Sequence, residues 1–88
     1  MSALVQVRLD PWTRVAEFVH QLVELPYVRE AMVLAGDHDL AVVIDCADLT
    51  DLDATIRQLR GIGAEETVTQ IVLRTVPGPD REPGAQQP

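Results

Sequence analysis

The chain has 88 residues, enough for one small domain whose stability is marginal unless it self-associates. Fourteen acidic residues against seven arginines, with no lysine, give a net charge of −7, which excludes the basic surface needed for direct binding to nucleic acid or an anionic membrane. The single cysteine excludes an internal disulfide and a cysteine-cluster metal site, and without a leader or membrane-length apolar run the expected location is the cytoplasm.

The N-terminal third alternates between apolar and polar residues and then changes to a helical period. Val5, Val7 and Leu9 share one face of residues 4–9, which is typical of a strand with one buried face. Asp10 or Thr13 is expected to cap the helix that follows. This helix ends before Pro26 and carries an apolar stripe made of Val15, Phe18, Val19, Leu22 and Val23.

Trp12 stands at the start of this predicted helix. The position permits two roles, covering the edge of the core or docking a partner. The first is the preferred interpretation.

Two apolar runs, near residues 27–35 and 39–46, flank the polar cluster Gly36, Asp37, His38 and Asp39. Glycine adopts a positive φ without steric cost, and aspartate tolerates turn geometry. The pattern predicts a β-hairpin with this cluster at an exposed tip. Carboxylates, an imidazole and accessible backbone would then crowd one loop, which makes the tip the first candidate site for a small polar molecule.

A second helix and a last strand complete the domain. Asp48 or Thr50 caps the helix, which ends near Gly61 and Gly63. Its predicted buried stripe is Leu49, Leu52, Ile56 and Leu59. The strand, near residues 65–75, places Thr67, Thr69, Ile71 and Leu73 on one face and Val68, Gln70, Val72 and Arg74 on the other. Residues 77–88 are rich in proline and glycine and are expected to be disordered, so the domain spans residues 1–76.

The element order β-α-β-β-α-β predicts an α+β, ferredoxin-like fold. Right-handed crossovers would place both helices on one face of a four-stranded antiparallel sheet. The other face would hold either Gln6 and Arg8 with Ala41, Val43 and Asp45, or the opposite set. Because small and β-branched residues lie among polar ones there, we expect that face to pack against a second copy in a homodimer.

The sequence resembles the effector-binding domain, often called the RAM domain, of the leucine-responsive regulatory protein (Lrp)/AsnC family. The resemblance covers about residues 3–76 and is carried by residues 25–31, 35–40, 48–49, 52–53, 62–67 and 69–73. It implies the ferredoxin-like fold, sheet-to-sheet dimers, often rings of dimers, and amino-acid effectors bound between neighbouring dimers near the hairpin. The ligand-binding residues it implies here are Gly36, Asp37, His38, Asp39, Thr67 and Thr69.

Two departures from the family pattern matter. A usual family member begins with a helix-turn-helix DNA-binding domain, whereas here the ferredoxin-like pattern begins at residue 3, so we expect a stand-alone effector domain. His38 stands where the family commonly has an aromatic residue. That difference bears on which effector is bound.

An α-amino acid needs an acceptor for its ammonium group and donors for its carboxylate. Asp37 or Asp39 would supply the acceptor through a charge-assisted hydrogen bond. Amide groups beside Gly36, helped by the hydroxyl of Thr67 or Thr69, would supply the donors. The alternative interpretation is that the aspartates only stabilise their own turn and the threonines are ordinary strand residues.

We therefore predict a non-enzymatic, homo-oligomeric, amino-acid-binding regulatory module that needs no cofactor or metal. Its expected macromolecular partners are full-length Lrp/AsnC-type regulators of amino acid metabolism. One alternative is a small ferredoxin-like dimeric enzyme of the monooxygenase or isomerase type, which would need a His, Tyr or Arg on an inner strand face. The other is a dimerisation module without a ligand. The inner strand faces are Val, Leu and Ile, which favours the regulatory module.

Overall fold

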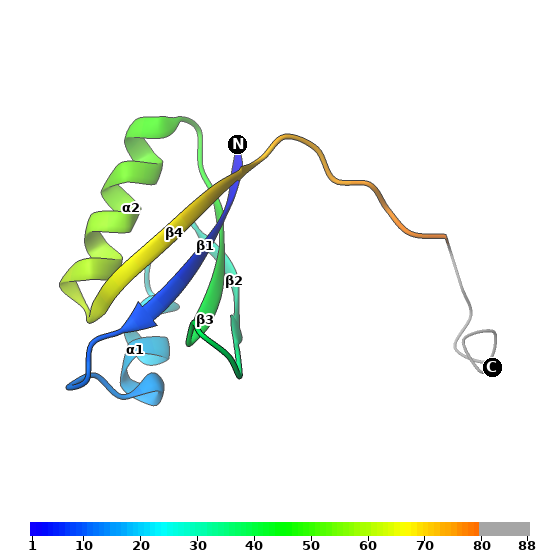
Figure 1. The fold of residues 1–88 in the computed structure, drawn as a ribbon. Helices are drawn as coiled ribbons and strands as arrows, with labels where there is room; N and C mark the ends of the chain where they lie inside the picture. The colour runs from blue at the N-terminus through cyan, green and yellow to red at the C-terminus, as the bar shows by residue number, and fades with distance from the viewer. Residues whose placement is uncertain (80–88) are drawn as a thin grey trace, which may run out of the picture.

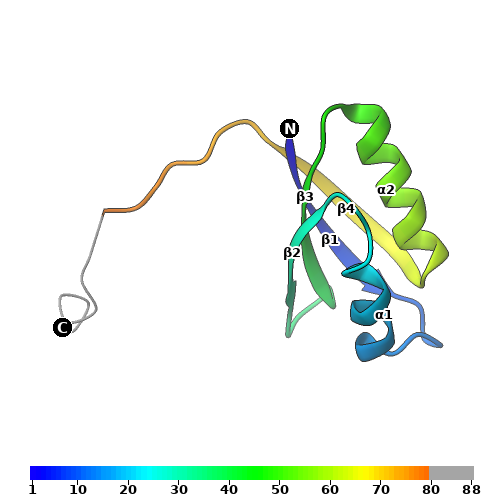
Figure 2. The same cartoon turned by 180° about the vertical axis from the view of Figure 1, so that it is seen from behind.

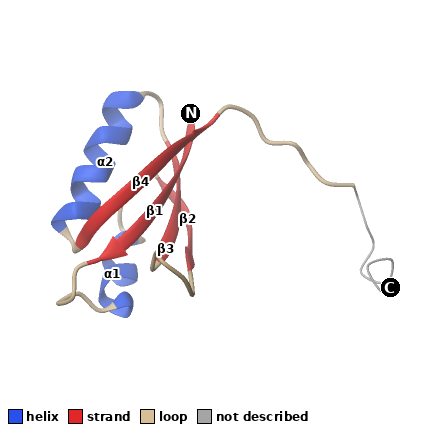
Figure 3. Ribbon diagram, in the orientation of Figure 1, coloured by secondary structure: helices blue, strands red, loops and turns tan. Residues whose placement is uncertain are grey.

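The computed structural model describes residues 1–79. Four strands form one antiparallel sheet in the order β2-β3-β1-β4, and both helices cover the same face (Figures 1 and 2). The elements, which Figure 3 separates by type, are β1 (Ser2–Leu9), α1 (Val15–Leu22), β2 (Val28–Val33), β3 (Leu40–Asp45), α2 (Leu49–Gly61) and β4 (Ala64–Val72). The predicted ferredoxin-like α+β fold is confirmed.

The core lies between the sheet and the two helices. Alternate residues of the central strands point toward the helices, so that Val5 and Val7 of β1 and Val42 of β3 are fully buried. Phe18 of α1 and Leu59 of α2 fill the space above them. Each such side chain contributes about 1.5–3 kcal/mol when it leaves water, and this burial holds the helices on the sheet.

The two helices begin differently from one another. Asp48 caps α2, and its carboxylate accepts a hydrogen bond from the Asp51 N–H at 3.0 Å. Of the two predicted caps, Asp48 is therefore the one the structure uses. For α1 both predicted caps are wrong, because the helix begins after Arg14, whose side chain makes no capping bond. The Asp10 carboxylate instead stabilises a separate turn that precedes the helix.

Three residues depart from the predicted apolar stripes. Val23 and Leu49 are 63% and 62% exposed; Val23 is the C-cap of α1 and Leu49 is the first residue of α2. Thr55, which was not predicted to be buried, is 1% exposed on α2. Its hydroxyl donates to the carbonyl of Asp51 at 2.8 Å, which satisfies the polar group inside the core.

Gly63 joins the end of α2 to the turn before α1. Among the described residues only Gly63 has a positive φ, at 127°. Its carbonyl accepts a hydrogen bond from the Asp10 N–H at 2.9 Å, and a Cβ at this position would lie within 2.8 Å of the Thr13 side chain. At Gly36, by contrast, φ is not positive and an added Cβ would contact nothing, so the turn geometry predicted for that glycine is wrong.

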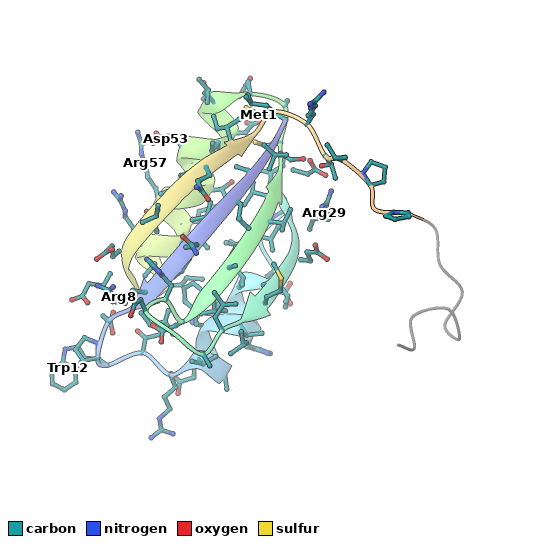
Figure 4. The ribbon with its side chains drawn as sticks, turned by 45° about the vertical axis from the view of Figure 1, so that its right-hand side comes forward. Met1, Arg8, Trp12, Arg29, Asp53 and Arg57 are labelled. Carbon is teal, nitrogen blue, oxygen red and sulfur yellow. The ribbon has the colours of Figure 1, made fainter. Side chains whose placement is uncertain are left out.

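The face of the sheet opposite the helices, here called the open face, is covered by no element of residues 1–79 (Figure 4 looks onto it). The register pairs Leu4 with Val43 and Gln6 with Ala41, so the predicted set containing Gln6, Arg8, Ala41, Val43 and Asp45 is the one on this face. An apolar centre runs across all four strands. Its members are Leu4, Met32, Ala41, Val43, Val68 and Val72.

After β4 the chain leaves the domain in an extended conformation, as Figures 1 and 2 show. The predicted disordered tail, residues 77–88, lies outside the described residues from residue 80 onward. No helix within residues 1–79 is long and apolar enough to cross a membrane.

Candidate functional site

The predicted hairpin tip forms between β2 and β3, but it does not stand free of the sheet. The Leu34 N–H donates to the Asp39 carbonyl at 2.9 Å and closes the loop. The Asp39 N–H donates to the carbonyl of Val7 at 2.8 Å and holds the loop against the end of β1. The tip therefore has one defined position relative to β1.

The Asp39 side chain reinforces this attachment. One carboxylate oxygen, Oδ2, accepts a hydrogen bond from the Leu9 N–H at 2.8 Å. The pairing of β1 with β4 shifts register between Arg8 and Leu9, and the carboxylate satisfies an amide at that irregularity. One oxygen of Asp39 thus has a structural role, but toward β1 and not within its own turn as the alternative interpretation proposes.

Arg8, which belongs to the central strand β1, connects the hairpin tip to the edge strand β4. Its Nε donates to the carbonyl oxygen of Asp37 at 3.2 Å, and its Nη1 donates to Glu66 Oε2 of β4 at 2.9 Å. Both side chains of the ion pair are nearly half exposed, so the pair contributes at most about 1 kcal/mol. Figure 4 shows Arg8 at the end of the sheet where the hairpin turns.

His38 is less exposed than predicted, since its side chain is only 19% accessible. Its Nε2 atom is shielded from solvent, makes no hydrogen bond within residues 1–79, and lies 3.8 Å from Glu66 Oε1. A shielded polar atom without a partner costs about 1–3 kcal/mol. A ligand group that reaches Nε2 and donates a hydrogen bond would remove that cost.

The loop also offers hydrogen-bond donors. No hydrogen bond within residues 1–79 uses the backbone N–H of Gly36, Asp37 or His38. Consecutive amides without a partner in the described chain are available as hydrogen-bond donors to an anionic group. They lie beside the exposed side chain of Asp37, so donors and an acceptor occur within four residues.

Thr67 and Thr69 do not join the hairpin tip within one chain. They pair with Val7 and Val5 and lie on the helix side of edge strand β4, whereas Arg8 and Glu66 lie on the open face. The Thr67 hydroxyl is within 3.5 Å of Arg60 Nη2 of α2. The structure therefore brings together Gly36, Asp37, His38 and Asp39, and leaves the two threonines on the other face.

Arg8 and Glu66 belong to this site but were not among the predicted site residues. Periodicity places Arg8 on the face opposite Val7, and only the register of three strands brings it to Asp37 and Glu66. The available signal was that Arg8 is the one charged residue of the central strand β1.

The shifted pKa values belong to the other end of the sheet. A hydrogen bond from the Ser2 hydroxyl, helped by Arg29, lowers the pKa of the Asp45 carboxyl, and burial raises the pKa of the Cys46 thiol. Both residues follow or end β3, away from the tip that precedes it. No group of three potential metal-ligating side chains occurs in the described part of the chain.

Residues 2–79 match the model of a protein family described as the Lrp/AsnC ligand binding domain. The chain belongs to this family. The resemblance predicted from the sequence is confirmed over nearly the whole described chain.

Similarity to whole proteins shows where such domains occur. The Lrp/AsnC-type domain is 30% identical over 75 residues to a homocitrate synthase of Sulfolobus acidocaldarius, covering 84% of this chain and 16% of that protein. It is also 30% identical over 76 residues to the HTH-type transcriptional regulator LysM of Saccharolobus solfataricus, covering 85% of this chain and 54% of the regulator. The chain thus spans about a sixth of the enzyme and about half of the regulator.

Solved structures include proteins of the same size. TTHA0845 from Thermus thermophilus is 31% identical, with a TM-score of 0.73, and the match covers 88% of this chain and 98% of that one. The feast or famine regulatory protein Rv3291c of M. tuberculosis, complexed with L-methionine, has a TM-score of 0.74 at 22% identity, covering 92% of this chain and 55% of that one. The latter likeness concerns the fold.

Proposed function

We propose that this Lrp/AsnC-type domain is a non-enzymatic regulatory module that binds an α-amino acid at the hairpin tip. The observation that carries the proposal is the tip itself, where three free backbone amides lie beside an exposed carboxylate and a shielded imidazole nitrogen without a partner. Family membership supports a ligand-binding role. L-methionine in the similarly folded M. tuberculosis regulator supports an amino acid as the ligand class.

The groups of the tip match the two charges of an amino acid. The free amides of residues 36–38 suit the ligand carboxylate, and the Asp37 carboxylate, which is exposed, suits the ammonium group. Asp39 has one oxygen engaged with Leu9 and retains the other for the ligand. Thr67 and Thr69 face away from this tip, so they complete such a site only when a second subunit supplies them.

Assembly is the second part of the proposal. The open face exposes an apolar centre built from four strands, and two such faces pack together about 10 Å apart. A homodimer closed in this way would bury Leu4, Val43 and Val68. Arg8 and Glu66, which hold the tip, lie at the margin of the same face.

A ligand at the tip and contacts between subunits would then influence one another. Because Arg8 binds both the tip and β4, a ligand that moves the tip changes the margin of the open face. Binding and assembly would be linked reciprocally, each changing the free energy of the other. Full-length Lrp/AsnC-type regulators, which carry similar domains, are the expected partners for mixed oligomers.

A catalytic role is less well supported. The inner faces of β1 and β3 are built from Ala, Val, Leu and Ile. Similar domains occur both in proteins named homocitrate synthase and in a helix-turn-helix regulator. Because one carrier is named as an enzyme and the other as a transcriptional regulator, a role that is independent of either activity, such as effector binding, is favoured.

The test is a thermal-unfolding screen of the purified chain against the twenty amino acids. A ligand present at 100 times its Kd adds about 2.7 kcal/mol of stability, which raises the Tm of so small a domain by roughly 10 °C or more. Asp37→Asn should abolish the shift, whereas Asp53→Asn on the exposed surface of α2 should leave it intact. A screen in which no amino acid raises the Tm would contradict the proposal.

A further inference from the structure

The indole side chain of Trp12 belongs neither to the hydrophobic core nor to the candidate site. It belongs to the only tryptophan of the chain, and the residue is 90% exposed. The preferred sequence interpretation, that it covers the edge of the core, is therefore wrong. Figure 4 shows the ring at the end of the loop between β1 and α1, pointing away from the domain.

The turn that presents Trp12 is held at several points. The Asp10 carboxylate accepts hydrogen bonds from the Trp12 N–H at 2.9 Å and the Thr13 hydroxyl at 2.8 Å. The Asp10 N–H donates to the Gly63 carbonyl, and Gly63 packs directly against Thr13. A large aromatic side chain on a fixed turn loses little conformational entropy when it binds, which is characteristic of an interface anchor.

The neighbouring helix offers a surface that would accept such an anchor. A shallow hollow of about 440 Å³ lies on the outer side of α1 and is lined by Ala16, Glu17, His20 and Gln21. Ala16 leaves room for a ring, and the His20 ring offers an aromatic surface. Glu17 and Gln21 carry oxygens that can accept the indole N–H, which needs a partner when it is buried.

We propose that two copies of this chain associate reciprocally, with Trp12 of each copy seated in the α1 hollow of the other. Trp12 lies four residues before Ala16 of the hollow, so a two-fold axis between the turn and α1 would make both contacts at once. Seating Trp12 in this way runs the two α1 helices antiparallel and brings Arg14 of each copy toward Glu17 of the other. Within residues 1–79 neither Arg14 nor Glu17 forms an ion pair, so the opposite charges favour a second copy as the occupant.

This contact is separate from the open face, which lies on the other side of the sheet. A chain with two different self-complementary surfaces builds assemblies larger than a dimer. The turn of Trp12 follows the end of β1 that also holds the hairpin tip, so the contact would bring the tips of different dimers to the same end. The Trp12 contact itself does not depend on the proposed open-face dimer. Only the size of the final assembly depends on that dimer.

The single tryptophan makes the contact directly measurable. The fluorescence emission maximum of the wild-type chain, followed through a concentration series, should shift to shorter wavelength as sedimentation velocity shows larger species. Ala16→Arg keeps helix propensity but fills the hollow, so its emission should stay at the wavelength of an exposed indole and the larger species should disappear. Ala54→Arg, on the exposed side of α2, is the matched control and should behave as wild type.

Two further variants test the geometry. Trp12→Ala should weaken the association by about 30-fold or more, as expected for an interface anchor, while the circular dichroism spectrum of the fold is retained. Arg14→Glu and Glu17→Arg should each weaken it, and the double variant should recover part of the loss.

Emission that stays constant while species larger than a dimer form would overturn the inference, as would an Ala16→Arg variant that still forms those larger species. An indole that becomes buried only when an unrelated protein is added would overturn it too, because the occupant would not be a second copy. None of these measurements uses an amino acid ligand, so a failed effector screen leaves them interpretable.

Discussion

At the scale of single residues, Gly63 has the most demanding position in the domain. Its positive φ turns the chain from α2 into β4, and its lack of a side chain lets Thr13 approach the backbone. Asp10, Thr13 and Gly63 thereby connect the start of one helix to the end of the other. The sequence pattern identifies Gly63 as a helix terminator, but the contact with a residue 50 positions earlier depends on tertiary structure.

We expect Gly63→Ala to destabilise the domain by about 2–4 kcal/mol, because it combines a left-handed backbone with a steric clash. Gly61→Ala is the matched control, since nothing lies within 4 Å of its added Cβ, and it should leave stability unchanged or slightly raised. Urea unfolding at one fixed protein concentration measures both. Equal midpoints for the two variants would contradict this account of Gly63.

At the scale of elements, periodicity predicted which segments become strands and which become helices. Buried residues recur at every second position in the strands and at every third or fourth position in the helices. Periodicity could not predict where α1 begins, since the Asp10 carboxylate is able either to cap a helix or to stabilise a turn. Nor could it predict the exposure of Leu49, the first residue of α2.

The candidate site was predictable only in part. The loop of residues 36–39 follows from local turn chemistry, and its location is confirmed as the β2–β3 connection. Its attachment through Arg8 and Glu66 joins residues 58 positions apart, which no local pattern specifies. The assignment of Gly36 to Asp39, Thr67 and Thr69 as ligand-binding residues stays a prediction.

The attachment of the hairpin element to β1 depends on Asp39. Asp39→Ala should leave the Leu9 amide without its acceptor, costing about 1–3 kcal/mol and speeding hydrogen exchange of that amide by roughly tenfold or more. Asp37→Ala is the control, because no hydrogen bond within residues 1–79 involves its carboxylate. Unchanged exchange at Leu9 in the first variant, followed by NMR, would show that another acceptor replaces Asp39.

At the scale of the whole molecule, an apolar sheet face and an exposed aromatic anchor occupy different sides of one small, acidic domain. A chain of this size gains stability from self-association, and both surfaces offer it. The proposed assembly therefore has two levels, with dimers formed through the open face and larger oligomers formed through Trp12.

Val43→Asp tests the first level. It places a carboxylate at the centre of the open face opposite Leu4, and an uncompensated buried charge should weaken dimerisation by at least about 100-fold. Val76→Asp introduces the same change on the extended segment after β4 and should have little effect. Analytical ultracentrifugation distinguishes the two, and a Val43→Asp chain that dimerises like wild type would contradict the sheet-to-sheet arrangement.

The pairing of Ser2 with Val72 has a practical consequence. It brings the start of β1 and the end of β4 together at one pole of the domain, while the hairpin tip and the tryptophan turn occupy the opposite pole. A purification tag, a fluorescent reporter or another protein joined directly to the start of β1 or to the end of β4 would therefore attach at the pole away from both proposed contact regions. The points where the chain enters and leaves the sheet are thus separated by the length of the strands from the loop proposed to bind a ligand.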